Sequence, residues 1–321
     1  MPRAIEALTT IARPLVFLFT PHLILFAAAL LVSAVLGGAP CADFQLPRPD
    51  HVLIVILENH GFDSIIGSPD APYINELAAH GMSFTRSFGV THPSQPNYLA
   101  LFSGSTQNVN GNACPNDYST PNLASSLIAR GLTFAGFSEG LPGTGARLCT
   151  IGHYVRRHNP WANWQGAAAH AVPSEANLPW TSFPTDFSEL PTVSIVIPNN
   201  QHNMHDGTDP ARIREGDRWL RTNIASYVDW AMEHNSLFIL TWDEDNRREG
   251  NRIPTLFVGP MVRVGQSFQF ITHFNVLRTI QDFYQLSHSG QASVSDPIRD
   301  VWISVANPRQ SRTNPIASTP Q

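Results

Sequence analysis

The chain has 321 residues, a length that accommodates one large domain or two ordinary ones. Hydrophobic residues make up 42% and charged residues only 14%, which excludes a disordered protein and provides material for a large core. The net charge of −5 excludes an overall basic field for nucleic acid, and because all 20 basic residues are arginine, mechanisms that need a lysine are excluded too.

The N-terminal segment is apolar, with no charged residue between positions 14 and 38. This pattern predicts that residues 1–42 are a secretory signal peptide or, as the alternative, an uncleaved membrane anchor about 25 residues long. Removal of the segment leaves two cysteines, Cys114 and Cys149. In an exported chain we expect these to form one disulfide, and two unpaired buried thiols are the alternative.

From residue 50 onward, short apolar runs alternate with helical stretches. Strands are predicted at 51–57, 82–88, 132–138, 192–198, 237–242 and 254–259, and helices at 73–80, 95–104, 122–130, 209–234 and 272–286. Asn122 and Asp209 are the expected N-caps of two of these helices. The alternation predicts an α/β fold with a mostly parallel central sheet flanked by helices.

Residues 139–190 lack this periodicity and are rich in Pro, Trp, Gly and His. Linkers seldom carry tryptophans such as Trp161, Trp164 and Trp180, so we expect an ordered insertion that covers the site.

Polar side chains follow three of the predicted strands, and the carboxyl ends of parallel strands are where open α/β sheets bind ligands. These residues are Glu58 and Asn59 after the first strand, His205 and Asp206 after the fourth, and Asp243 and Glu244 after the fifth. The set is rich in oxygen donors, which suit Ca²⁺, Mg²⁺ or Mn²⁺, and with imidazole also Zn²⁺.

Ser94 lies where a strand gives way to a helix. A hydroxyl at this place meets the positive end of the helix dipole and free backbone N–H groups, which favours a nucleophile beside a phosphate site. An ordinary serine N-cap is the alternative.

Six segments together resemble the bacterial phosphoesterase family, which includes secreted acid phosphatases, phosphatidylinositol 3-phosphatase-like enzymes and, more distantly, phospholipases C, within the alkaline-phosphatase superfamily. They are ENHGFDSI at 58–65, THPSQPNYLALFSG at 91–104, NMHD at 203–206, WDED at 242–245, NRIPTLFVGP at 251–260 and ITHFNVLRTI at 271–280. The resemblance implies an alkaline-phosphatase-like fold and a catalytic domain at 43–306. The segment 307–321 is polar and rich in proline, so we expect it to be a flexible tail.

The resemblance also implies roles for single residues. It gives Ser94 as the nucleophile, Glu58, Asn59, Asp243 and Glu244 as ligands of one divalent metal ion with Asp206 as an additional candidate, and His92, His205 and Asn97 as contacts of the phosphate. The identity of the metal is left open among Ca, Mg, Mn and Zn. In the insertion, Arg156 and Arg157 are candidates to bind an anionic or lipid head group, and structural packing of an irregular loop is the alternative.

The implied activity is metal-dependent hydrolysis of phosphate monoesters through a phosphoserine at Ser94. His205 would act as phosphate contact or general acid, and a protonated histidine in that role would favour acidic pH. The expected substrate is a phosphorylated small molecule or the head group of a phosphoinositide or phospholipid, reached by an exported, secreted or periplasmic protein in transient contact with a membrane surface.

Three alternatives compete with this interpretation. A phospholipase C or other phosphodiesterase would share the same site, and an exported binding module would keep the fold without turnover. A sulfatase is disfavoured, because Pro96 is followed by Asn97 and Tyr98 rather than by the arginine that the sulfatase motif requires.

Overall fold

The structure is a computed structural model that describes residues 45–303. The predicted N-terminal segment and the predicted C-terminal tail both lie outside these residues. Between residues 45 and 303, no helix is long and apolar enough to cross a membrane.

An eight-stranded sheet forms the centre of the fold, in the order β11-β2-β10-β9-β1-β8-β4-β7. The strands are β1 (His51–Leu57), β2 (Met82–Phe84), β4 (Phe134–Ser138), β7 (Asn177–Pro179), β8 (Val193–Ile197), β9 (Ser236–Trp242), β10 (Thr255–Val258) and β11 (Gly265–Ser267). All neighbours pair in parallel except β10, which runs antiparallel to both β9 and β2. The predicted mostly parallel α/β fold is therefore confirmed.

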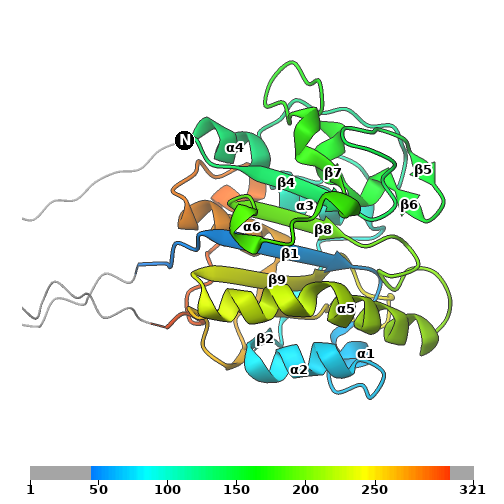
Figure 1. The fold of residues 1–321 in the computed structure, drawn as a ribbon, viewed down its shortest axis with the longest axis vertical. Coiled ribbons are helices and arrows are strands. Elements are labelled where there is room, and N and C mark those ends of the chain that lie inside the picture. The colour runs from blue at the N-terminus through cyan, green and yellow to red at the C-terminus, as the bar shows by residue number, and fades with distance from the viewer. Residues whose placement is uncertain (1–44, 304–321) are drawn as a thin grey trace, which may run out of the picture. The chain divides into compact units, whose positions relative to one another are not determined.

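Helices cover both faces of this sheet (Figure 1). They are α1 (Phe62–Ile65), α2 (Pro72–His80), α3 (Gln95–Ser103), α4 (Leu123–Ala129), α5 (Ala211–Glu233) and α6 (His273–Phe283). α2 and α5 pack into one hydrophobic core, whereas α3, α4 and α6 pack into the other. Alternate residues of β1 enter the two cores, Ile54 one and Val55 the other, which explains why its sequence is apolar throughout.

Local signals fix the helix ends in most cases. Asn122 accepts from the backbone N–H of Ser125 and caps α4, and Gly104 ends α3 at a φ of 72°. The expectation for Asp209 is wrong: its carboxylate does not cap α5, because Arg212 and His60 hold it instead.

The predicted strand at 82–88 is in fact two short strands. β2 pairs within the main sheet, and the chain then leaves the sheet to form β3 (Ser87–Phe88), which pairs in parallel with β12 (Ile271–Thr272). Strands of two or three residues carry too little periodicity to be recognised, so the break between β2 and β3 and the strands β11 and β12 were not predicted.

The insertion at 139–190 is ordered. It contains the hairpin β5 (Thr150–Ile151) with β6 (Tyr154–Val155), five short 3₁₀ turns, and β7, which adds an edge strand to the sheet. The turns are Arg156–His158, Pro160–Asn163, Ser174–Ala176, Trp180–Ser182 and Phe187–Glu189. Trp161 is fully buried against Gly136 of β4, where a Cβ would lie only 2.0 Å from the indole ring.

Cys114 and Cys149 form the predicted disulfide, with their Cα atoms 5.8 Å apart and a sequence separation of 35. The bond joins the insertion to the loop that follows α3.

Candidate active site

Two neighbouring parallel strands deliver the carboxylates to one place. Glu58 and Asn59 follow β1, and Asp243 and Glu244 follow β9. Asn59 has a φ of 54°, a left-handed conformation that asparagine tolerates, and its backbone N–H donates to Asp243 Oδ1 at 3.1 Å. Its side-chain amide donates to Glu58 Oε2. The structure thus brings these four residues together, and we call Glu58, Asp243 and Glu244 the carboxylate cluster.

Ser94 precedes α3 without capping it through its side chain. Its hydroxyl oxygen lies 3.2 Å from Glu58 Oε2 and 3.0 Å from Glu244 Oε1, within hydrogen-bonding distance of both carboxylates. The residue is only 4% exposed. The hydroxyl is therefore held by the carboxylate cluster, and the N-cap alternative does not describe it.

Glu58 is fully buried and satisfied by several donors. Tyr98 donates its hydroxyl to Glu58 Oε1 at 2.6 Å, and His158 Nε2 lies 3.0 Å from the same oxygen. The rings of Tyr98 and His158 stack with centroids 5.0 Å apart. Burial alone would raise the pKa of Glu58, but these contacts outweigh it and lower the pKa. Glu58 is thus the member of the cluster that stays ionised most readily.

The pKa values of the other two carboxylates are shifted in the opposite direction. Burial, together with the charges of Glu58 and Glu244, raises the pKa of Asp243 well above its usual range. Burial likewise raises the pKa of Glu244 to about 7, against the hydrogen bond from Ser94. Behind them, burial lowers the pKa of His273 to about 4, so its neutral ring donates Nε2–H to the Asp243 carbonyl at 2.7 Å.

The cluster has the donors that a hard divalent cation requires. Asp243 Oδ2 is buried and has no hydrogen-bond partner among the described residues, beside two further carboxylates and the Asn59 side chain. An unpaired buried carboxylate oxygen is costly unless a cation or donor meets it. As they stand, no three His, Cys, Asp or Glu side chains within 45–303 converge as a metal site. The chemistry of the donors fits a cation nonetheless.

His92 and Asn97, both expected to contact phosphate, have other partners in the structure. His92 Nδ1 bonds to Glu244 Oε2, and its Nε2 lies 3.2 Å from Asp245 Oδ1. Asn97 accepts from the backbone N–H groups of residues 90 and 91 at 2.8 and 3.1 Å and donates to the Thr91 carbonyl at 2.8 Å. It therefore shapes the loop that leads into Ser94.

His205 and Asp206 form a separate pair beside the cluster. His205 Nδ1 lies 2.8 Å from Asp206 Oδ1, and His153 lies 3.0 Å from the other carboxylate oxygen. The His205 ring lies 6.1 Å from that of His158. His158 thus lies between His205 and the carboxylate cluster, and Asp206 shares no hydrogen bond with the cluster.

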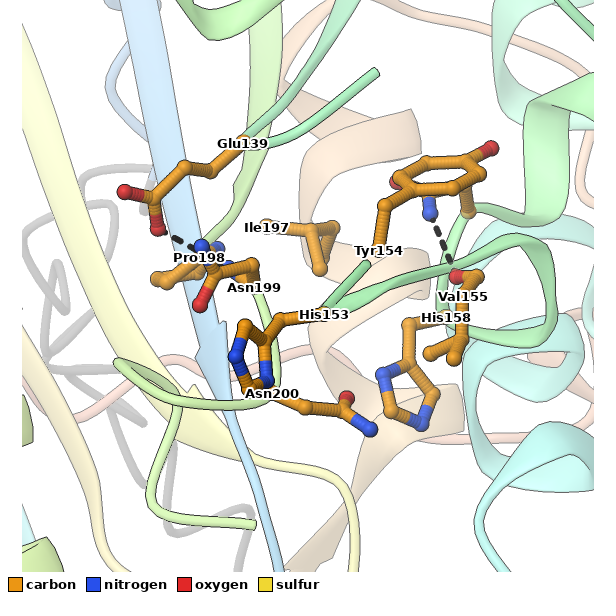
Figure 2. A pocket seen from close by; sticks show the side chains of 10 residues that line it. Glu139, His153, Tyr154, Val155, His158, Ile197, Pro198, Asn199 and Asn200 are labelled. Carbon is orange, nitrogen blue, oxygen red and sulfur yellow. Dashed lines mark hydrogen bonds between the residues drawn. The ribbon is translucent and has the colours of Figure 1, made fainter. Parts of the chain in front are cut away.

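A small cavity opens on the same side. Figure 2 shows its lining, in which the Asn200 side chain points toward the ring of His158, whereas Glu139 lies on the other side and accepts from the Asn199 N–H. Asn200 is 7% exposed, and its Oδ1 has no hydrogen-bond partner in the described chain. The cavity therefore offers an unpaired polar group next to His158.

The two arginines of the insertion are placed differently. Arg156 is buried, and its guanidinium donates to Asn163, to backbone carbonyls at 116, 147 and 162, and to Asp117 Oδ1 at 3.3 Å, which occupies it structurally. Arg157 is half-buried, its Nε has no partner among residues 45–303, and its charge acts on Tyr98 and His158. Of the two, only Arg157 is brought near the site.

Sequence reasoning did not single out Tyr98, His158, His273 and Asp245. Tyr98 falls one turn after Ser94 on α3, and that spacing is a signal that was available. His158 lies in the aperiodic insertion, 100 residues from Glu58, and nothing in its local sequence points to that contact. Asp245 accepts from three backbone N–H groups at 247–251 and so shapes the loop beside the site.

Known proteins are similar in sequence to most of this chain. A family model described as the phosphoesterase family matches residues 68–287. The phosphatidylinositol-3-phosphatase of Mycobacterium tuberculosis is 43% identical over 310 residues, which cover 94% of this chain and 99% of that protein. An acid phosphatase of Aspergillus fumigatus is 28% identical over 255 residues, covering 74% of this chain and 55% of the fungal protein. The chain thus spans about half the length of the fungal relative.

Among solved structures, a protein of the alkaline phosphatase superfamily from Vibrio parahaemolyticus matches with a TM-score of 0.52. The match covers 79% of this chain and 71% of that one at 14% sequence identity. This likeness concerns the fold.

Proposed function

Because the chain belongs to the phosphoesterase family and is a hydrolase of phosphate esters, we propose that it cleaves phosphate monoesters with Ser94 as nucleophile. The proposal rests on the position of the Ser94 hydroxyl. Its oxygen lies 3.0 and 3.2 Å from two carboxylates and does not cap the helix that follows. Such an arrangement of a hydroxyl beside proton acceptors is the usual form of an activated nucleophile.

The residues of the chain suffice for a balanced reaction. The Ser94 oxygen attacks phosphorus in line as its proton passes to Glu244 or Glu58, and the bond from phosphorus to the leaving oxygen breaks. His205 in its protonated form supplies the proton to the leaving alcohol. Water then cleaves the phosphoserine, which releases phosphate and restores the serine hydroxyl.

Glu58, Asn59, Asp243 and Glu244 are the residues that would hold one divalent cation, and Asp206 remains a more distant candidate. When bound, such a cation would neutralise the repulsion among the three carboxylates and favour ionisation of the serine hydroxyl. The unpaired Asp243 Oδ2 and the raised pKa of Asp243 support this assignment.

The proposed substrate is the phosphate of a small molecule or of a phosphoinositide head group. The Mycobacterium relative is named for the second kind of substrate and matches this chain nearly end to end. We further propose that residues 1–42 direct export and that 43–306 act as one catalytic domain. The disulfide supports export, because such bonds persist in oxidising compartments.

The test is substitution of the nucleophile. Ser94→Ala should lower the rate of p-nitrophenyl phosphate hydrolysis by at least about 10³-fold and abolish the labelled phosphoserine trapped by acid quenching. Ser103→Ala is the matched control, since Ser103 is a buried serine of the same helix whose hydroxyl donates to the Leu99 carbonyl. The control should keep its activity.

Three outcomes contradict the proposal. Undiminished hydrolysis by Ser94→Ala rejects the nucleophile. Faster cleavage of bis-p-nitrophenyl phosphate than of the monoester replaces the phosphatase with a phosphodiesterase, and cleavage of neither ester supports a binding module.

A further inference from the structure

We propose that the carboxyl-terminal end of the sheet strands, where the active site lies, also carries a docking surface for an anionic lipid bilayer. The surface is formed by Phe268, Phe270, Arg86 and Arg248. We call these four residues the rim. The inference rests on the proposed function, because it would bring a phosphorylated lipid head group within reach of Ser94.

The rim contains the most exposed aromatic side chains of the described chain. Phe268 is 69% exposed and Phe270 is 53% exposed, whereas every other Phe, Tyr and Trp between residues 45 and 303 is buried or half-buried. The two residues alternate along an extended segment that follows β11. Neighbouring exposed aromatic rings are costly in water and mark surfaces that meet an apolar partner.

Strand direction places these side chains at the active-site edge. β11 is parallel to β2, β2 is antiparallel to β10, and β10 is antiparallel to β9, so β11 and β9 point the same way. Residues after β11 therefore emerge on the same side as the residues after β9 and β1. Four strand spacings separate β11 from β1, about 19 Å at the usual 4.8 Å spacing.

The rim is continuous with the loops around the site. Phe270 stacks on Phe88 with ring centroids 5.2 Å apart, and β3, which contains Phe88, pairs with β12. The next residue, Gly89, donates its N–H to the Asn251 carbonyl at 2.9 Å. Asn251 ends the loop at 245–251, which starts one residue after Glu244 and carries Arg248.

The two charges of the rim are positive, and the carboxylates of the loop that carries Arg248 have partners of their own: Asp245 accepts from backbone N–H groups, and Glu249 accepts from the Asp63 N–H and the Ser64 hydroxyl. The Arg86 guanidinium lies 5.9 Å from the centre of the Phe270 ring, and both Arg86 and Arg248 are exposed. Neither takes part in an ion pair with another described residue. The segments 82–90 and 261–273 contain no Asp or Glu. Aromatic rings beside unpaired arginines match the interface of an anionic bilayer, where rings enter the head-group region and cations meet lipid phosphates.

The test measures binding to vesicles with the full chain, purified so that every variant has the same sequenced N-terminus. The vesicles are of phosphatidylcholine, with or without phosphatidylserine. We expect Phe268→Ser with Phe270→Ser to weaken binding to the anionic vesicles about ten-fold or more. Arg86→Gln with Arg248→Gln should remove the preference for phosphatidylserine.

The matched control replaces two exposed apolar residues near the opposite, amino-terminal end of the sheet strands. Ile128 and Met232 are 42% and 43% exposed and lie near the ends of α4 and α5, the helices that lead into β4 and β9. Ile128→Ser with Met232→Ser should bind vesicles as the unchanged protein does. Arg263→Gln with Arg299→Gln, two exposed arginines outside the rim, controls for net charge.

A second readout separates docking from catalysis. All variants should hydrolyse soluble p-nitrophenyl phosphate at the unchanged rate, while the phenylalanine variant cleaves vesicle-borne phosphatidylinositol 3-phosphate about ten-fold more slowly. The proposal is overturned if the phenylalanine variant and its control bind vesicles equally well. It is also overturned if sedimentation shows that the rim mediates association between copies of the chain instead. If the protein hydrolyses none of the esters but still binds vesicles through the rim, the proposed function is rejected and the docking surface is not.

Discussion

Replacement of Asn97 by alanine separates a loop-shaping role from contact with the substrate. The side chain is 1% exposed and makes three good hydrogen bonds, of 2.8, 3.1 and 2.8 Å, to the backbone at 90–91. Alanine would leave the two backbone N–H groups of this loop without a partner, and the Thr91 carbonyl would keep only the longer bond from the Asn251 amide, at 3.2 Å. Each lost bond costs roughly 0.5–1.5 kcal/mol, so we expect a loss of about 2–4 kcal/mol in the free energy of unfolding.

The same change should displace the nucleophile. The loop held by Asn97 leads directly to Ser94, and an error of about 1 Å in the position of a reacting atom can cost about 10²-fold in rate. We expect kcat for p-nitrophenyl phosphate to fall by that order, with the inhibition constant of inorganic phosphate unchanged. Steady-state kinetics and thermal unfolding measure both effects.

Asn75→Ala is the matched control for stability. The Asn75 side chain also holds a loop, accepting from the Gly67 N–H and donating to the carbonyls of Ile65, Ser68 and Ala71, and it lies on α2. It should lose similar stability and keep its kcat. If Asn97→Ala keeps its kcat but binds phosphate much more weakly, Asn97 contacts the substrate and the positioning role is refuted.

Three further predictions concern stability. Chelation with EDTA should lower the melting temperature, and added Mg²⁺ or Mn²⁺ should restore it, because Asp243 Oδ2 is otherwise unpaired; an unchanged melting curve argues against a bound cation. Cys149→Ser removes the bond to Cys114 and should cost roughly 3–4 kcal/mol in urea unfolding, the value for a loop of this length, and a loss under 1 kcal/mol would contradict that estimate. Gly136→Ala should cost at least about 2 kcal/mol, because its Cβ would overlap the Trp161 ring, and a neutral result would show that the ring can move.

The sequence predicted those parts of the site that follow long, regular elements. β1 and β9 are seven-residue apolar strands, so the residues after them were placed at one edge before any contact was known. Ser94 was found because the start of α3 is marked by Pro96. Where the hydrophobic periodicity and the ends of helices and strands are clear in the sequence, the functional side chains at those ends can be predicted as well.

Contacts between distant and irregular segments were beyond such reasoning. His158 reaches Glu58 from a 3₁₀ turn that has no periodic signal. The roles of His92 and Asn97 depend on side-chain direction within one loop, which residue type alone does not determine. Arg156 carries the charge of a substrate contact, but the backbone carbonyls around it are its partners.

The disulfide has a consequence for when the site becomes complete. The Cys149 carbonyl accepts from the Arg156 N–H at 2.9 Å, and the turn that starts there ends at His158, so the tether and the histidine belong to one short segment. The carboxylates follow strands of the sheet and do not depend on this bond, whereas the segment that carries His158 gains a covalent restraint once the thiols are oxidised. Under the proposed export, we expect oxidation of the two thiols to be a maturation step that delays full activity until the chain reaches an oxidising compartment. A fully reduced, folded protein with undiminished activity would show that no such delay exists.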